Sequence, residues 1–81
     1  MTRNKVTIIP NATAAFLRGR REGLGITRED IAATIGRSVS TIRRWESIGI
    51  PGGISANTIR SVAVAYGVSA DDICDRLQLA Q

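Results

Sequence analysis

The sequence contains no histidine and a single cysteine, Cys74, among its 81 residues. The missing histidine removes the usual general base of enzymes and the commonest zinc ligand. One cysteine cannot form an intrachain disulfide, and it is compatible with a reducing cytoplasm. These absences predict a cytoplasmic protein that is not an enzyme and that needs no metal or other cofactor.

Aromatic residues and long apolar runs are also scarce. Phe16, Trp45 and Tyr66 are the only aromatic residues, so aliphatic residues and alanine must fill most of one small core. No apolar run is long enough to cross a membrane, and we expect no membrane partner.

Positive charge is concentrated toward the N-terminus. Residues 1–60 contain ten lysines and arginines and four acidic residues, whereas residues 61–81 contain one arginine and three aspartates. A basic body with an acidic end favours a polyanionic partner for one face. A solvated basic surface would give the same composition, so charge alone does not decide between the two.

Apolar spacing and capping residues predict five short helices and an all-α fold. We expect the helices at about 12–22, 28–35, 39–47, 55–66 and 70–77. Asn11, Thr27, Ser38 and Ser69 have side chains suited to N-caps, and Gly36 and Gly67 suit helix exits. We divide the chain into an N-terminal arm or short strand at 1–10, a domain at 11–76 and a tail at 77–81. The short turn between the second and third helices permits a helix-turn-helix.

The third predicted helix has two different faces. Ile42 and Trp45 are three residues apart and share an apolar side. The other side carries Val39, Ser40, Arg43, Arg44 and Ser47. Such a helix can pack its back into a core and present a cationic front to an anionic partner.

Three segments resemble the lambda-repressor/Cro-type, or XRE-like, helix-turn-helix family across residues 17–73. They are LRGRREGLGITREDIAATIG, SVSTIRRWE and ISANTIRSVAVAYGVSADDI. The matching positions are Arg21, Gly25 to Thr27, Ala32, Gly36, Ser38, Glu46 and Tyr66 to Ser69. The resemblance implies a five-helix bundle that regulates transcription by binding double-stranded operator DNA. It further implies a Cro-like repressor of a phage or mobile element, which binds an inverted repeat as a homodimer in a bacterial cytoplasm.

The resemblance also implies roles for individual residues. Base contacts fall on Val39, Ser40, Arg43 and Arg44, with Arg44 able to reach guanine and Arg43 able to take a base or a phosphate. Phosphate contacts fall on Arg28, Ser38, Thr41 and Ser47. Arg37 departs from the family pattern, which often has an apolar residue at this turn position, and its stem could cover the core while its head takes a phosphate. A backbone N–H at the helix start near Arg28 would add to anion binding there.

Two further sets of residues are expected to be structural or to mediate assembly. Arg21 and Glu46 match a family ion pair that fixes the recognition helix. Ile48, Ile50 and Ile54 lie in a loop rich in glycine and proline. We expect at least one of them to contact a second subunit, and the alternative is that they pack as local core beneath the next helix.

Two alternative functions remain open. The string VSTIRRWESIGIPGG also resembles MerR-like and excisionase winged helices, which would make the protein an architectural DNA binder. Asp71, Asp72 and Asp75 could instead meet a basic protein partner, as in an antitoxin-type regulator.

Overall fold

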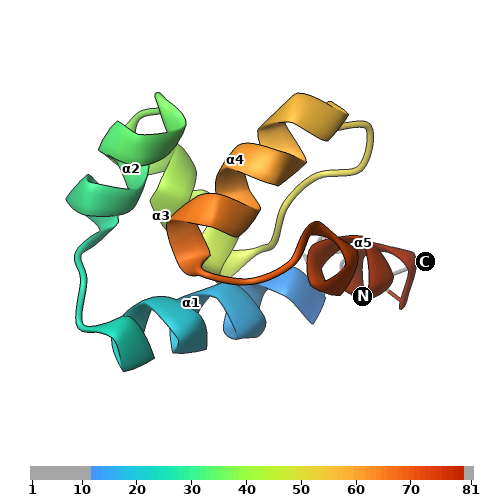
Figure 1. Cartoon of the computed structure of the whole chain (residues 1–81), viewed down its shortest axis with the longest axis horizontal. Helices are drawn as coiled ribbons and strands as arrows, with labels where there is room; N and C mark the ends of the chain where they lie inside the picture. The colour runs from blue at the N-terminus through green and yellow to red at the C-terminus, as the bar shows by residue number, and fades with distance from the viewer. Residues whose placement is uncertain (1–11, 80–81) are drawn as a thin grey trace, which may run out of the picture.

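The computed structural model describes residues 12–79, and this part of the chain folds into five α-helices (Figure 1). They are α1 (Ala12–Leu24), α2 (Arg28–Ile35), α3 (Val39–Ser47), α4 (Ala56–Tyr66) and α5 (Ala70–Leu79). Between residues 12 and 79 there is no strand, so the predicted all-α fold is confirmed. Within the same residues, no helix is long and apolar enough to cross a membrane.

Capping groups fix the turn that separates α2 from α3. The Thr27 hydroxyl accepts from the Asp30 N–H, and the Asp30 carboxylate accepts from the Thr27 N–H, both at 3.1 Å. This reciprocal capping box defines the start of α2. Gly36 ends α2 with a φ of 80°, and the Ser38 hydroxyl then accepts from the Thr41 N–H to start α3. The predicted limits of both helices are therefore confirmed.

Two helices are longer than the sequence pattern indicates. Helix α1 continues through Gly23 to Leu24, because the left-handed backbone that ends it lies at Gly25, with a φ of 71°. Helix α5 continues to Leu79, two residues beyond the expected end. The predicted arm at 1–10 and the cap at Asn11 lie outside the described residues.

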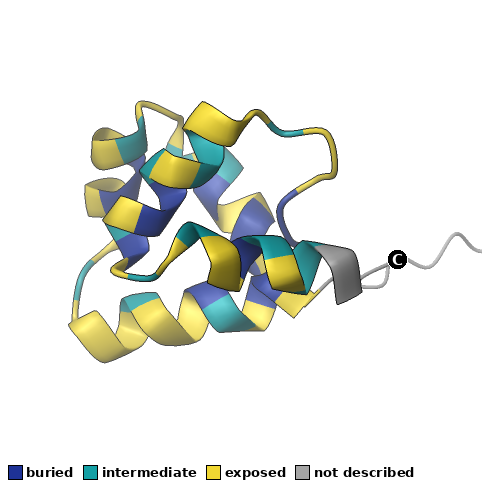
Figure 2. Ribbon diagram, turned by 45° about the vertical axis from the view of Figure 1, so that its right-hand side comes forward, coloured by how far each residue is buried: buried dark blue, intermediate teal, exposed yellow. Residues whose placement is uncertain are grey.

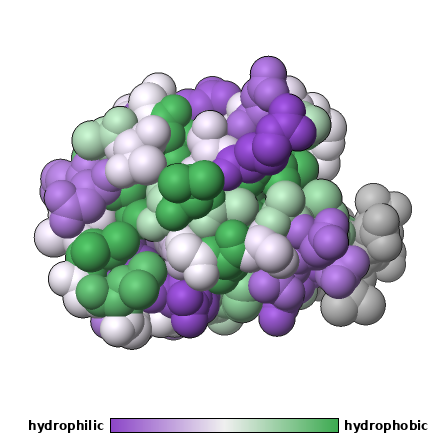
Figure 3. Space-filling view, in the orientation of Figure 1, coloured by the Kyte–Doolittle hydropathy of each residue, from purple (hydrophilic) through white to green (hydrophobic). Residues whose placement is uncertain are grey.

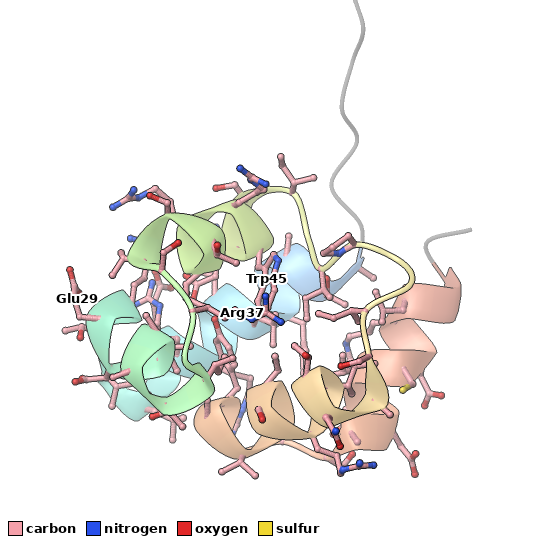
Figure 4. The ribbon with its side chains drawn as sticks, turned by 90° about the horizontal axis from the view of Figure 1, so that it is seen from above. Glu29, Arg37 and Trp45 are labelled. Atoms are coloured by element: carbon pink, nitrogen blue, oxygen red, sulfur yellow. The ribbon has the colours of Figure 1, made fainter. Side chains whose placement is uncertain are left out.

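Every helix contributes to one core (Figure 2). Its buried hydrophobic members are Ala14, Leu17, Ile31, Ala32, Ile42, Trp45, Ile50, Val62, Ala63, Tyr66 and Ile73. Helix α3 packs against both α1 and α2, and α4 packs against α2 and α5. Trp45 points from α3 into the body of the protein, as the pattern predicts (Figure 4). The apolar back of α3 is thus held on several sides.

The loop after α3 corrects one prediction about dimer contacts. Ile50 is fully buried, and its backbone N–H donates to the Thr13 hydroxyl of α1 at 2.9 Å. Ile50 is therefore core and has no surface for a second subunit, because the loop folds back over α1. Ile54 is partly buried against the core, and Ile48 is half-buried.

The segment that follows this loop bears on the winged-helix alternative. A winged helix would place a β-wing after the tryptophan helix, whereas residues 56–79 form α4 and α5 with a short turn between them. The winged-helix prediction is therefore wrong for the described part of the chain. An antitoxin-type role is untouched by this observation.

Candidate nucleic-acid interface

A single buried carboxylate links four of the helices. Glu46 lies near the end of α3, and its side chain is 0% exposed. Both of its oxygens accept from Arg21 Nε of α1, at 3.0 and 2.9 Å. Oε1 also accepts from Arg28 Nε of α2 at 3.2 Å, and Oε2 accepts from the Tyr66 hydroxyl of α4 at 2.8 Å. Removing a carboxylate from water is costly unless it is paired and hydrogen-bonded, and this one is.

Arg21 ties this carboxylate to the turn between α1 and α2. Its side chain is 11% exposed, and its Nη1 donates to the Ile26 carbonyl at 3.1 Å. The hydrogen bonds to Glu46 raise the pKa of Arg21, and the nearby negative charge acts in the same direction. The structure thus brings together the two residues expected to pair, in a position that holds α3 rather than facing outward.

Tyr66 and Arg28 are members of this network that sequence reasoning missed. The sequence pattern gives Tyr66 no partner at this carboxylate, and the resemblance directs Arg28 to a phosphate. Burial, followed by the hydrogen bond to Glu46, raises the pKa of the Tyr66 phenol. A usable signal was present, because a buried tyrosine needs a partner for its hydroxyl. Arg28 gave no such signal, since its distance from Glu46 depends on how α2 crosses α3.

The nine arginines of the described residues divide into two groups. Six have partners inside the fold: Arg20 on the Gly67 carbonyl, Arg21 and Arg28 on Glu46, Arg37 on Thr58, Arg60 on Asn57 and Arg76 on Asp72. Arg76 also stacks over the Phe16 ring at 3.7 Å. Between residues 12 and 79, Arg18, Arg43 and Arg44 have no such partner. Two of these three arginines, Arg43 and Arg44, are adjacent on α3.

The outward face of α3 is polar and cationic. Ser40, Arg43 and Arg44 are exposed, whereas Thr41 is half-buried. Val39 is also half-buried and packs against the edge of the core. Figure 4 shows side chains projecting from α3 into solvent on the side away from Trp45. The predicted base-contacting residues therefore share a free surface, with Val39 at its margin.

Most of the predicted phosphate contacts already serve the fold. The Ser38 hydroxyl caps α3 and bonds the Thr41 hydroxyl at 3.0 Å. The Ser47 hydroxyl donates to the Arg43 carbonyl within α3, at 2.9 Å. The exposed guanidinium of Arg37 donates to the Thr58 hydroxyl of α4 at 3.2 Å. These side chains remain at the surface, but each has an intramolecular bond that DNA would have to keep or replace.

A hollow of about 270 Å³ lies where the start of α2 meets α3. Thr27 and Arg28 line it from the α2 side, and Val39 and Arg43 line it from α3. Glu29 also contributes to the rim, and Figure 4 shows its side chain projecting from α2 into solvent. The hollow brings a residue expected to bind phosphate beside two expected to meet bases.

The face seen in Figure 3 is different in character. It shows apolar side chains over α1 and α4, the helices that carry the exposed large hydrophobic residues Leu24 and Val64. Helix α3 lies behind α4 in this orientation, and the view from above also puts the two helices on opposite sides (Figures 1 and 4). The cationic face of α3 therefore points away from this apolar face.

Comparison with protein families identifies the domain. A family model described as "Helix-turn-helix domain" matches residues 12–75, which span all five helices except the end of α5. No curated protein and no solved structure matches the chain.

Proposed function

Because the chain belongs to this helix-turn-helix domain family, we propose that it is a sequence-specific transcription regulator that reads the major groove of double-stranded DNA with α3. The observation that supports this most is the pairing pattern of the arginines. Arg43 and Arg44 lie exposed on α3 without a partner among residues 12–79, whereas six other arginines of these residues are bound within the fold. Recognition helices of this kind place their first residues at base edges.

We assign base reading to Arg44, Arg43, Ser40 and Val39. An arginine can donate two hydrogen bonds to guanine O6 and N7, the commonest specific contact in the major groove. The half-buried Val39 offers a methyl surface to a thymine at the edge of the site. Arg28 and the hydroxyl-bearing residues at the start of α3 take phosphates, which set the register without reading sequence.

We further propose that two copies bind an inverted-repeat operator and repress transcription by excluding RNA polymerase, as a Cro-like regulator of a phage or mobile element would. The two-fold symmetry of such an operator mirrors that of a dimer. Ile48 and Ile54 are the remaining loop candidates for the contact between subunits, since both are half-buried whereas Ile50 is core. The arm at 1–10 would add backbone contacts beside a DNA-binding domain at 11–76.

Footprinting tests this proposal. The protein is titrated against the DNA upstream of its own gene and against a scrambled duplex, at two salt concentrations. We expect a protected two-fold symmetric site with half-sites about one helical turn apart, preferred over the scrambled duplex. Equal binding to both duplexes that disappears at the higher salt concentration would mean that the α3 face binds polyanions without sequence specificity. A protein partner would then be sought.

A further inference from the structure

The guanidinium of Arg28 is held by one edge only. Its Nε donates to Glu46 Oε1 at 3.2 Å, and its side chain is 35% exposed. The other oxygen of the carboxylate, Oε2, is already taken by Arg21 and Tyr66. The two terminal nitrogens of Arg28 have no hydrogen bond or ion pair with the residues that the structure describes. Arg28 is therefore anchored through its inner nitrogen and keeps four N–H groups to offer.

The hollow beside α3 is suited to an anion. Arg28 lines it together with Arg43, which has no partner within residues 12–79. The start of α2 lies at the same place, and the positive end of the helix dipole favours negative charge there, against which the Glu29 carboxylate in the lining acts. A phosphate group in the hollow could thus meet the terminal nitrogens of one arginine and the whole guanidinium of another.

We propose that Glu46 is a positioning residue for DNA binding, which holds Arg28 by its Nε so that its terminal nitrogens are aligned for one backbone phosphate. This inference rests on the proposed function. Ordering a long side chain at an interface costs free energy, and a guanidinium that the fold already orders avoids part of this cost. Lysine cannot replace Arg28 in this role. An arginine can donate to the carboxylate through Nε and to a phosphate through its terminal nitrogens, whereas a lysine has a single ammonium group for both.

An effect of net charge and an effect on the position of Arg28 predict opposite changes in DNA affinity for Glu46→Gln. The substitution makes the protein one unit more positive, so charge alone predicts tighter binding to every duplex. Positioning predicts weaker binding to every duplex, by roughly 2- to 10-fold, because Arg28 must then be ordered at the interface. Base preference is expected to stay unchanged, since a phosphate carries no sequence information.

The test measures dissociation constants of the operator and of a scrambled duplex for four variants, with circular dichroism showing that each is folded. The variants are Glu46→Gln, Arg28→Lys, their combination, and Arg18→Lys as a control for an unpartnered arginine. We expect Glu46→Gln and Arg28→Lys each to weaken binding to both duplexes by roughly 2- to 10-fold, with Arg18→Lys close to the wild type. The combination should be little weaker than either single variant, because both remove the same alignment.

Tighter binding by Glu46→Gln, or losses that multiply in the combined variant, would overturn the inference while the wild type still footprints its operator. If Glu46→Gln does not fold, the comparison of Arg28→Lys with Arg18→Lys tests the inference. Equal dissociation constants for these two variants would overturn the inference. A wild-type protein that binds neither duplex would instead refute the proposed function, and the inference with it.

Discussion

Replacing Tyr66 with phenylalanine removes one oxygen from the centre of the fold. The ring stays in a site that is 0% exposed, so no cavity of note is created. The loss is one hydrogen bond of 2.8 Å to a carboxylate, and bonds to charged groups contribute about 1.5–3 kcal/mol. Because Glu46 Oε2 keeps Arg21 Nε at 2.9 Å, the carboxylate is not orphaned, and we expect the lower end, about 1.5 kcal/mol. A domain of this size is stable by roughly 4–12 kcal/mol, so the variant should fold.

The same hydroxyl makes stability depend on alkaline pH. Burial and the bond to Glu46 raise the pKa of Tyr66 above its ordinary value of 10.0. Because the pKa is raised in the folded state, the contribution of this hydroxyl to the free energy of unfolding is complete below pH 10. It declines above pH 10, where the unfolded chain releases a proton that the folded chain keeps. The expected loss is about 1.4 kcal/mol per pH unit above pH 10. Tyr66→Phe should lack this component.

Urea unfolding of the wild type and Tyr66→Phe at neutral pH and at about pH 11 checks both points. Tyr66 is the only tyrosine in the chain, so tyrosinate absorbance in the folded protein reports this one group. We expect no tyrosinate signal until the protein unfolds. A tyrosinate signal from the folded protein near the ordinary pKa of tyrosine would refute the reasoning. So would a Tyr66→Phe variant that is as stable as the wild type and loses the same stability at alkaline pH.

Four other substitutions test the interface and its support. Arg44→Ala should lower discrimination at one operator base pair by about 1–3 kcal/mol, and an unchanged base preference in competition binding would remove its reading role. Arg28→Ala should weaken all duplexes alike and make the salt dependence shallower by about one phosphate, and a shift in base preference would count against it. Arg21→Ala should cost about 3–5 kcal/mol in urea unfolding because it strips a buried carboxylate of its main partner, whereas Arg18→Ala on the same helix should change stability by less than about 0.5 kcal/mol. Trp45→Ala should cost about 3–5 kcal/mol, and a stable variant with lost DNA binding would mean that this side chain serves DNA rather than the core.

The sequence alone determined the local structure of this protein. Thr27 and Ser38 start their helices, and Gly36 ends one, through bonds that reach no more than four residues along the chain. The face that Ile42 and Trp45 share likewise follows from helical spacing, so the orientation of α3 with its arginines outward was predictable. The end of α1 does not follow from the position of glycines alone, since Gly23 is tolerated inside the helix and Gly25 takes the left-handed backbone instead.

Only the tertiary structure decided which residues meet around Glu46. Its partners are 25, 18 and 20 residues away and come from three different helices, so their distances depend on how the helices cross. The resemblance implied the pair with Arg21, but nothing local distinguishes an Arg28 bound to a buried carboxylate from one that is free. Ile50 makes the same point, because an isoleucine in a glycine-rich loop is core only where the loop folds back over α1. Periodicity and capping act within one helix, whereas burial and pairing act between helices, and the second kind of information exists only once the chain has folded.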